Sequence, residues 1–196
     1  MKPSFGGILP PSKRPDPPHL TNSSQFPFLL SIGQIHDNSL PCAQYLKFRP
    51  QFFKLRHLKS LPVFNCIISP SHGPISIQSA NWDSFSFSST IESIEFRANP
   101  GLTGQIPTSV GNLKKLQSLV LIDNGLSGGL PVSIGKLTQL KRLVLSGNLL
   151  KGKIPESYGD LSELLILDLS RKSLSGSLPL ISNSNSNFPY YIISAM

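Results

Sequence analysis

The sequence predicts an α/β-type repeat fold, a right-handed solenoid whose short parallel strands line a concave face, and three observations lead to this prediction. Four segments share one apolar register, the segments recur at a nearly constant interval, and each is followed by a turn element that contains glycine and proline. An apolar pattern with a fixed period of this kind is typical of solenoids. With 196 residues, of which 39% are hydrophobic, the chain has material for one small domain of this kind.

The apolar register reads Leu-x-x-Leu-x-Leu-x-x-Asn and is the signature of a leucine-rich repeat, in which each repeat contributes one strand to a horseshoe. The repeats begin at Ile91, Leu116, Leu140 and Leu164. Because side chains alternate along a strand, the apolar positions point into the core and the residues between them point to the concave face. We expect the asparagine at the ninth position to bond the backbone of its own and neighbouring turns in a structural ladder. The ladder residues are Asn99, Asn124 and Asn148.

The second half of each repeat carries the element Leu-x-Gly-x-Ile/Leu-Pro. Its copies span residues 102–107, 126–131, 150–155 and 174–179. Glycine allows a backbone turn that a Cβ atom would obstruct, and proline fixes φ where the chain leaves the turn. We therefore expect turns or 3-10 segments on the convex face.

This element resembles the plant-specific class of leucine-rich repeats, found in receptor kinases, receptor-like proteins and polygalacturonase inhibitors, and the resemblance covers about residues 42–180. Residues 95–104 and 162–170, with 35–42 and 57–61 upstream, are similar to plant receptor-like proteins of the Piriformospora indica-insensitive type. The resemblance implies a non-enzymatic module that binds a protein or peptide ligand in defence or symbiosis signalling and passes its output to a co-receptor kinase. It also implies a place at the cell surface, at the plasma membrane or in the apoplast.

Four parts are expected along the chain. They are a disordered leader (1–41), a degenerate N-terminal repeat region with an insert (42–90), the plant-type repeats (91–180) and an irregular tail (181–196). The leader is rich in proline and lacks the register, while the insert, residues 67–90, is either a looped-out excursion or a degenerate repeat. Because solenoids need capping elements at their ends, we expect the chain to be truncated at both ends. The alternative is that residues 190–193 fold back as a cap.

The spacing of the ionisable residues does not favour an enzyme. The four histidines are scattered outside the repeats, with no spacing that suits a nucleophile or a metal, so no catalytic, cofactor-binding or metal-binding residue is expected. The net charge of +8 comes without a stacking-aromatic motif, so we expect no nucleic-acid partner, although it would suit loose contact with acidic polymers such as pectin. No segment reaches about 18 apolar residues, so no transmembrane segment is expected. The first residues lack the apolar region of a signal peptide.

Two cysteines, Cys42 and Cys66, are separated by one repeat length. In an oxidising compartment they could form a disulfide between adjacent coils, with a contribution of about 3 kcal/mol to stability. Alternatively, Cys66 is buried in the place of a ladder asparagine and Cys42 is free. The sequence leaves both arrangements open.

The concave strand positions form the candidate binding face. They are Glu95, Arg97, Val120, Ile122, Asp123, Arg142, Val144, Ile166, Asp168 and Arg171. Their aliphatic side chains would make an exposed apolar stripe flanked by arginines, which suits a peptide or protein partner. The alternative is that these β-branched residues reflect strand propensity alone. Two other functions stay open: a polygalacturonase-inhibitor-like binding protein, and a truncated product with no independent function.

Overall fold

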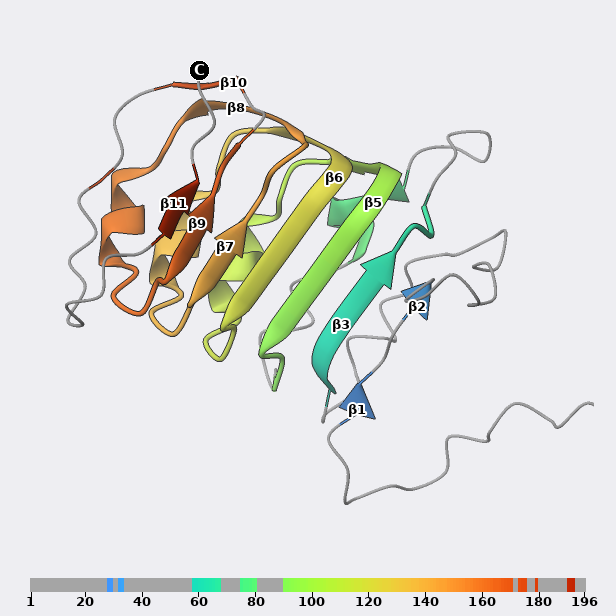
Figure 1. Cartoon of the computed structure of the whole chain (residues 1–196), viewed down its shortest axis with the longest axis horizontal. Helices are drawn as coiled ribbons and strands as arrows, with labels where there is room; N and C mark the ends of the chain where they lie inside the picture. The colour runs from blue at the N-terminus through green and yellow to red at the C-terminus, as the bar shows by residue number, and fades with distance from the viewer. Residues whose placement is uncertain are drawn as a thin grey trace, which may run out of the picture.

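The concave sheet of the solenoid is built from parallel strands that follow one another along the chain. The computed structural model describes residues 28–29, 32–33, 58–67, 75–80, 90–170, 173–175, 179 and 190–192. The central strands are β3 (Leu58–Phe64), β5 (Ser93–Gly104), β6 (Ser118–Gly128), β7 (Arg142–Val144) and β9 (Ile166–Asp168). They lie side by side in this order (Figure 1), and each pairs in parallel with the next. The predicted leucine-rich-repeat solenoid is confirmed.

Equivalent residues of successive repeats pair with one another, so each apolar position forms a row inside the solenoid. Ile94 pairs with Leu119, Leu119 with Leu143, and Leu143 with Leu167, and all four side chains are fully buried. Burying a side chain of this size contributes about 1.5 to 3 kcal/mol. Because each row is shared by neighbouring repeats, the core stabilises the array rather than a single repeat.

The convex side carries short helices and a second row of strands. The helices are η5 (Thr108–Asn112), η6 (Val132–Lys136) and η7 (Glu156–Asp160), and each follows the proline of a turn element. The strands are β4 (Ile75–Ser76), which pairs with β5, and β8 (Leu149–Lys153), which pairs with β6 and with β10 (Ser173–Ser175). The glycines of the turn element, Gly104, Gly128 and Gly152, have φ of 94°, 84° and 93°. Residues with a Cβ atom rarely adopt this conformation, which explains the glycine at this position.

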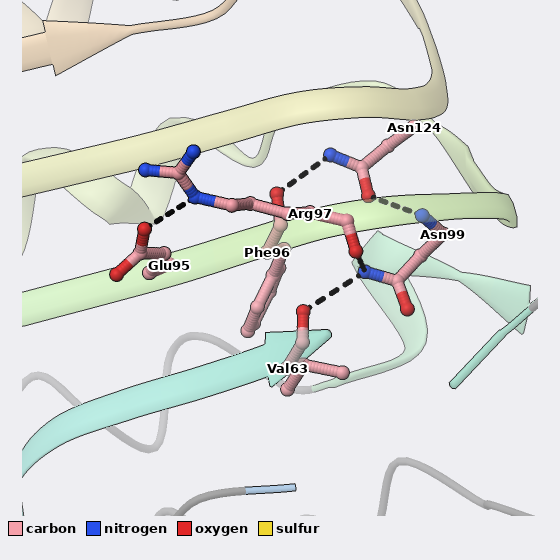
Figure 2. A network of polar contacts seen from close by, with 6 residues as sticks. All are labelled: Val63, Glu95, Phe96, Arg97, Asn99 and Asn124. Carbon is pink, nitrogen blue, oxygen red and sulfur yellow. Dashed lines mark hydrogen bonds and ion pairs between the residues drawn. The ribbon is translucent and has the colours of Figure 1, made fainter. Parts of the chain in front are cut away.

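Asparagine side chains join each turn to the preceding one (Figure 2). The Nδ2 group of Asn99 donates to the carbonyl oxygens of Val63 (3.0 Å) and Arg97 (2.8 Å). Its Oδ1 atom accepts from the amides of Cys66 (3.0 Å) and Ile67 (3.1 Å). One buried side chain therefore satisfies four backbone groups on two coils.

Asn124 and Asn148 repeat this arrangement with different partners. Asn124 Nδ2 donates to the carbonyl oxygen of Phe96 (3.0 Å), and its Oδ1 atom accepts from the amide of Asn99 (3.3 Å). Asn148 Nδ2 donates to the carbonyl oxygen of Leu121 in the preceding repeat (2.7 Å), while its Oδ1 atom is buried without a partner. Because these side chains are buried, a bond that is lost leaves a polar group that water does not reach.

Tyr158 occupies an apolar core position on the convex side. It stands one repeat length after Ile134, is fully buried in η7, and donates its hydroxyl hydrogen to the carbonyl oxygen of Pro131 (3.2 Å). Burial raises the pKa of the Tyr158 phenol, because the phenolate would lose its hydration. The hydroxyl thus adds a polar link between two repeats inside an apolar layer.

Short strands from the predicted leader cover the first edge of the sheet. β1 (Phe28–Leu29) and β2 (Ile32–Gly33) both pair in parallel with β3. The prediction of a disordered leader is wrong at these residues. The edge of β3 offers unpaired backbone groups, and a short extended segment satisfies them.

The insert contributes to the convex side. Its described residues form β4 and the helix η3 (Ile77–Ala80), and Ile75 pairs with Leu102 of the following turn element. This register favours a degenerate repeat over a looped-out excursion.

A short strand also covers the last edge of the sheet. β11 (Tyr190–Ile192) pairs in parallel with β9, and Tyr190 pairs with Ile166, which stands one repeat length earlier. The prediction of an irregular tail is wrong at β11, which keeps the repeat period. The alternative expectation, that residues 190–193 fold back as a cap, stays a prediction. The sequence carries the signal, because Phe188, Tyr191 and Ile193 stand at the first, fourth and sixth positions of the apolar register.

We predict that Asn99→Ala lowers the free energy of unfolding by about 3 kcal/mol or more, because four backbone groups lose their partner at about 1 kcal/mol or more each. Asn112 is exposed on η5, so Asn112→Ala is the matched control and should change stability by less than about 0.5 kcal/mol. Urea unfolding followed by circular dichroism measures both variants. Equal effects of the two substitutions would contradict the role of the ladder.

Tyr158→Phe should lower the free energy of unfolding by about 1 kcal/mol near neutral pH, because the Pro131 carbonyl loses its donor. The raised pKa of Tyr158 in the folded state adds a pH dependence. Its stabilising effect is fully present below the pKa of an unfolded phenol, about 10, and is lost as the pH rises from that value toward the raised pKa of the folded state. Between pH 8 and 11 the free energy of unfolding should therefore fall more steeply with pH for the wild type than for Tyr158→Phe. Identical pH dependences of the two proteins would disprove this account.

Candidate functional site

Three rows of outward-facing residues cross the concave sheet from strand to strand. The first row contains Ser93, Ser118, Arg142 and Ile166, the second Glu95, Val120, Val144 and Asp168, and the third Arg97 and Ile122. Residues two positions apart on a strand share a face, and the parallel pairing keeps them in register. The structure therefore brings eight of the ten predicted site residues together. Asp123 lies within β6 at a residue with positive φ that is not paired in register with β5, and Arg171 lies outside the described residues.

The predicted exposed apolar stripe is wrong at its centre. Val120 is 1% exposed and Val144 is 3% exposed, although both stand on the concave face and outside the main core cluster. Neighbouring strands are only about 4.8 Å apart, so a short side chain on a concave surface lies below its longer neighbours. Ile122 and Ile166 remain partly exposed. These two isoleucines are the apolar groups of the face that a ligand can reach.

The charged residues of the face are not equivalent. Glu95 and Arg97 lie two positions apart on β5 and form an ion pair (Figure 2). Asp168 accepts a hydrogen bond at Oδ1 from the amide of Ser170 (2.9 Å). Arg142 has no ion-pair or hydrogen-bond partner for its Nε atom, which is buried. Among the described residues of the face, Arg97 is thus neutralised by an acid and Arg142 is not.

Asp123 belongs to a position with positive φ that recurs in the four coils where the structure describes the residue before the ladder position. The residue before the ladder position has positive φ: 49° at Asn65, 54° at Ala98, 52° at Asp123 and 68° at Gly147. The Asp123 amide donates to the carbonyl oxygen of Ser146 (3.0 Å). A Cβ atom at Gly147 would clash with Asp123 Oδ1, so the carboxylate of Asp123 lies over Gly147. Asp123 is exposed at the rim of the face, beyond the three rows.

The positive net charge of the whole chain does not come from the described repeats. Residues 90–170 contain eight lysine and arginine residues and seven acidic residues, so they are nearly neutral. Their exposed lysines lie outside the concave rows, at Lys114, Lys115, Lys136, Lys141, Lys151 and Lys153. The concave face is therefore mixed in charge, which favours a ligand with specific polar groups over a uniformly acidic polymer.

Two negative findings hold for the described part of the chain. It contains no group of three or more histidine, cysteine or acidic residues that could hold a metal ion. Its helices are also too short to cross a membrane.

Cys66 is joined in a disulfide bond. It stands at the ladder position, and its amide donates to Asn99 Oδ1. The other cysteine of the sequence, Cys42, lies outside the described residues. The disulfide therefore acts on the same turn that the asparagine ladder holds.

The concave face also includes residues that the predicted set omits. On β3, Ser60, Pro62 and Phe64 pair with Ser93, Glu95 and Arg97 and extend the three rows by one strand. The apolar register that begins at Leu58 could have placed them there, because it predicts an opening strand with the same alternation.

Comparison with known proteins also points to leucine-rich repeats, as the sequence and the fold do. Residues 115–137 and 139–161 match the family described as Leucine Rich Repeat. The chain is 53% identical over 95 residues to Piriformospora indica-insensitive protein 2 of Arabidopsis thaliana, which covers 48% of this chain and 21% of the relative. It is 37% identical over 112 residues to Receptor like protein 29 of Arabidopsis thaliana, which covers 55% of this chain and 21% of the relative.

A solved structure is also similar. The plant peptide hormone receptor RGFR1, in complex with RGF2, superimposes with a TM-score of 0.58 at 30% identity, over 74% of this chain and 22% of that receptor. The chain thus spans about a fifth of the length of each of these three proteins. The resemblance to plant receptor-like proteins with leucine-rich repeats is confirmed.

We predict that Cys42 is the partner of Cys66. Thiol titration of the denatured wild-type protein should then find no free thiol, and Cys42→Ser and Cys66→Ser should each show one. Reduction should lower the free energy of unfolding by about 3 kcal/mol, because it releases a loop of this length in the unfolded chain. A free thiol in the wild type, or a covalent dimer on a non-reducing gel, would exclude this pairing.

Proposed function

We propose that the repeats form a non-enzymatic recognition module that binds an extended peptide or protein segment across the concave face. The three-row arrangement supports this proposal most directly, because it presents partly exposed apolar and charged side chains from consecutive strands on one continuous surface. The similarity to a peptide hormone receptor in complex with RGF2 supports the same kind of ligand.

The size of the face suits a short segment. The strands β3, β5, β6, β7 and β9 lie side by side, so at about 4.8 Å per strand the face is about 19 Å long. An extended chain of about six residues covers this length at about 3.3 Å per residue. Partly exposed isoleucines provide apolar anchors, and the flanking charges provide selectivity.

The proposal includes a place for the module in the plant cell. We infer that it acts in a cell-surface receptor-like protein, at the plasma membrane or in the apoplast, in defence or symbiosis signalling. The relatives named Piriformospora indica-insensitive protein 2 and Receptor like protein 29 support this inference. A co-receptor kinase would carry the output. Chemical cross-linking of the tagged chain in leaves should therefore recover a receptor kinase, and recovery of none would count against this part.

The binding proposal predicts an effect that is confined to the concave face. A random 12-residue peptide library displayed on phage would be selected on the purified chain, and enriched peptides would be synthesised for fluorescence anisotropy. Ile122→Glu should weaken their binding about tenfold or more, since it places an uncompensated charge at an apolar anchor. Val132→Glu is the matched control, because Val132 is 64% exposed on η6, outside the concave face.

The Val132→Glu variant should bind within about twofold of the wild type, because a surface change away from an interface has little effect on affinity. Circular dichroism and urea unfolding of both variants show that they fold. If a folded Ile122→Glu protein binds as tightly as the wild type, or if Val132→Glu loses binding equally, the concave face is not the site.

A further inference from the structure

Arg142 stands apart from the other charged side chains near the concave face because nothing in the described part of the chain neutralises it. The ion pairs among the described residues join Arg97 to Glu95 and Lys59 to Glu92. In register with Arg142, the adjacent strands place Ser118 on one side and Ile166 on the other. Neither neighbour carries a negative charge.

The acid on the next strand does not take this role. Asp168 pairs in register with Val144, one position along the face from Arg142. Its Oδ1 atom accepts the amide of Ser170 (2.9 Å), and it forms no ion pair with the arginine. One oxygen of the Asp168 carboxylate is thus used within its own turn, and the structure shows no ion pair between this carboxylate and Arg142.

The environment of Arg142 is partly desolvated. Its Nε atom is buried without a hydrogen-bond partner, while the residue as a whole remains partly exposed. Two valines with little exposure, Val120 and Val144, lie on the same face. A guanidinium next to apolar groups attracts an anion more strongly than one in bulk water does, because the local dielectric constant is lower. The geometry therefore favours an anionic group arriving from outside.

We propose that Arg142 selects ligands that present a carboxylate next to an apolar residue. This inference rests on the proposed peptide binding at the concave face. The planar guanidinium matches a carboxylate in charge and geometry, and Ile166, the next residue of the same row, contacts the neighbouring apolar side chain. The carboxylate comes either from an acidic side chain or from the C-terminus of the peptide.

The test uses two substitutions that remove the same charge from adjacent positions. Arg142→Gln removes the concave cation, and Lys141→Gln removes an exposed lysine one residue earlier, which lies outside the three concave rows. The phage library of random 12-residue peptides is selected on the wild type and on each variant. Asp and Glu should be enriched among peptides selected on the wild type and on Lys141→Gln, and this enrichment should disappear on Arg142→Gln.

Synthetic peptides then separate the two sources of the carboxylate. The best wild-type binder is made with its acidic residue changed to the amide, and separately with its C-terminal carboxylate amidated. One of the two changes should weaken binding to the wild type about tenfold or more, as expected for a lost charge-assisted bond, and should have little effect on Arg142→Gln. Arg142→Lys keeps the positive charge but loses the two parallel donors of the guanidinium. Its affinity for the acidic peptide should lie between those of the wild type and of Arg142→Gln.

The outcomes separate this inference from the proposal on which it rests. Acid-rich peptides selected equally well on a folded Arg142→Gln protein would overturn the role of Arg142 and leave peptide binding intact. An equal loss of the Asp and Glu enrichment on Lys141→Gln would also overturn the role of Arg142, because non-specific charge attraction would then explain the preference for acidic peptides. If the wild type enriches no peptide, the proposed function fails, and the inference fails with it.

Discussion

The asparagine ladder is the constraint on which the rest of the solenoid depends. Each coil turns sharply after its strand, and such a turn would leave buried amides and carbonyls without partners. Asn99 satisfies groups on two coils at once, with Cys66 and Ile67 on the earlier one. Since these bonds link equivalent points of successive repeats, they set the register that stacks the apolar rows. The concave rows inherit the same register, so the binding face is a consequence of how the turns are satisfied.

The concave face combines buried side chains at its centre with few groups that a ligand can contact. Val120 and Val144 are buried and hold the surface in place, whereas Ile122, Ile166 and Arg142 remain partly exposed. Such a surface offers little apolar area for non-specific binding, so ligand affinity must come from the positions of individual side chains. Specificity in such a module therefore depends on which charges are already paired within the protein. The Glu95–Arg97 pair lowers the number of free charges.

Much of the fold could be predicted from the sequence because its signals are periodic. The apolar register predicted the strands, and the glycine and proline element predicted the convex helices. Exposure could not be predicted, because it depends on side chains of other strands: Val120 and Val144 follow the same alternation as Ile122 and Ile166, yet only the isoleucines are reachable. The same limit applies to Arg142, whose lack of an acid partner is a matter of geometry.

The short strands at the edges of the sheet are hard to predict from the sequence for a different reason. β1, β2 and β11 are two or three residues long, and backbone pairing alone can hold such segments. Backbone pairing leaves almost no trace in residue type. At β11 the sequence does carry a signal, since Phe188, Tyr191 and Ile193 keep the apolar register, although the position is aromatic rather than leucine at two of these three residues.

The nearly constant spacing of the strands has a consequence for the entropy of loop closure. Each later central strand pairs with one that lies a single repeat length away, whereas the interval from Leu58 to Ile91, between the first two central strands, is longer. The cost of closing a loop grows only with the logarithm of its length, so the extra length adds about 0.3 kcal/mol. The join between the first two central strands can thus carry a long insertion almost without penalty. New sequence can therefore enter at this join while the register of the stacked face stays unchanged.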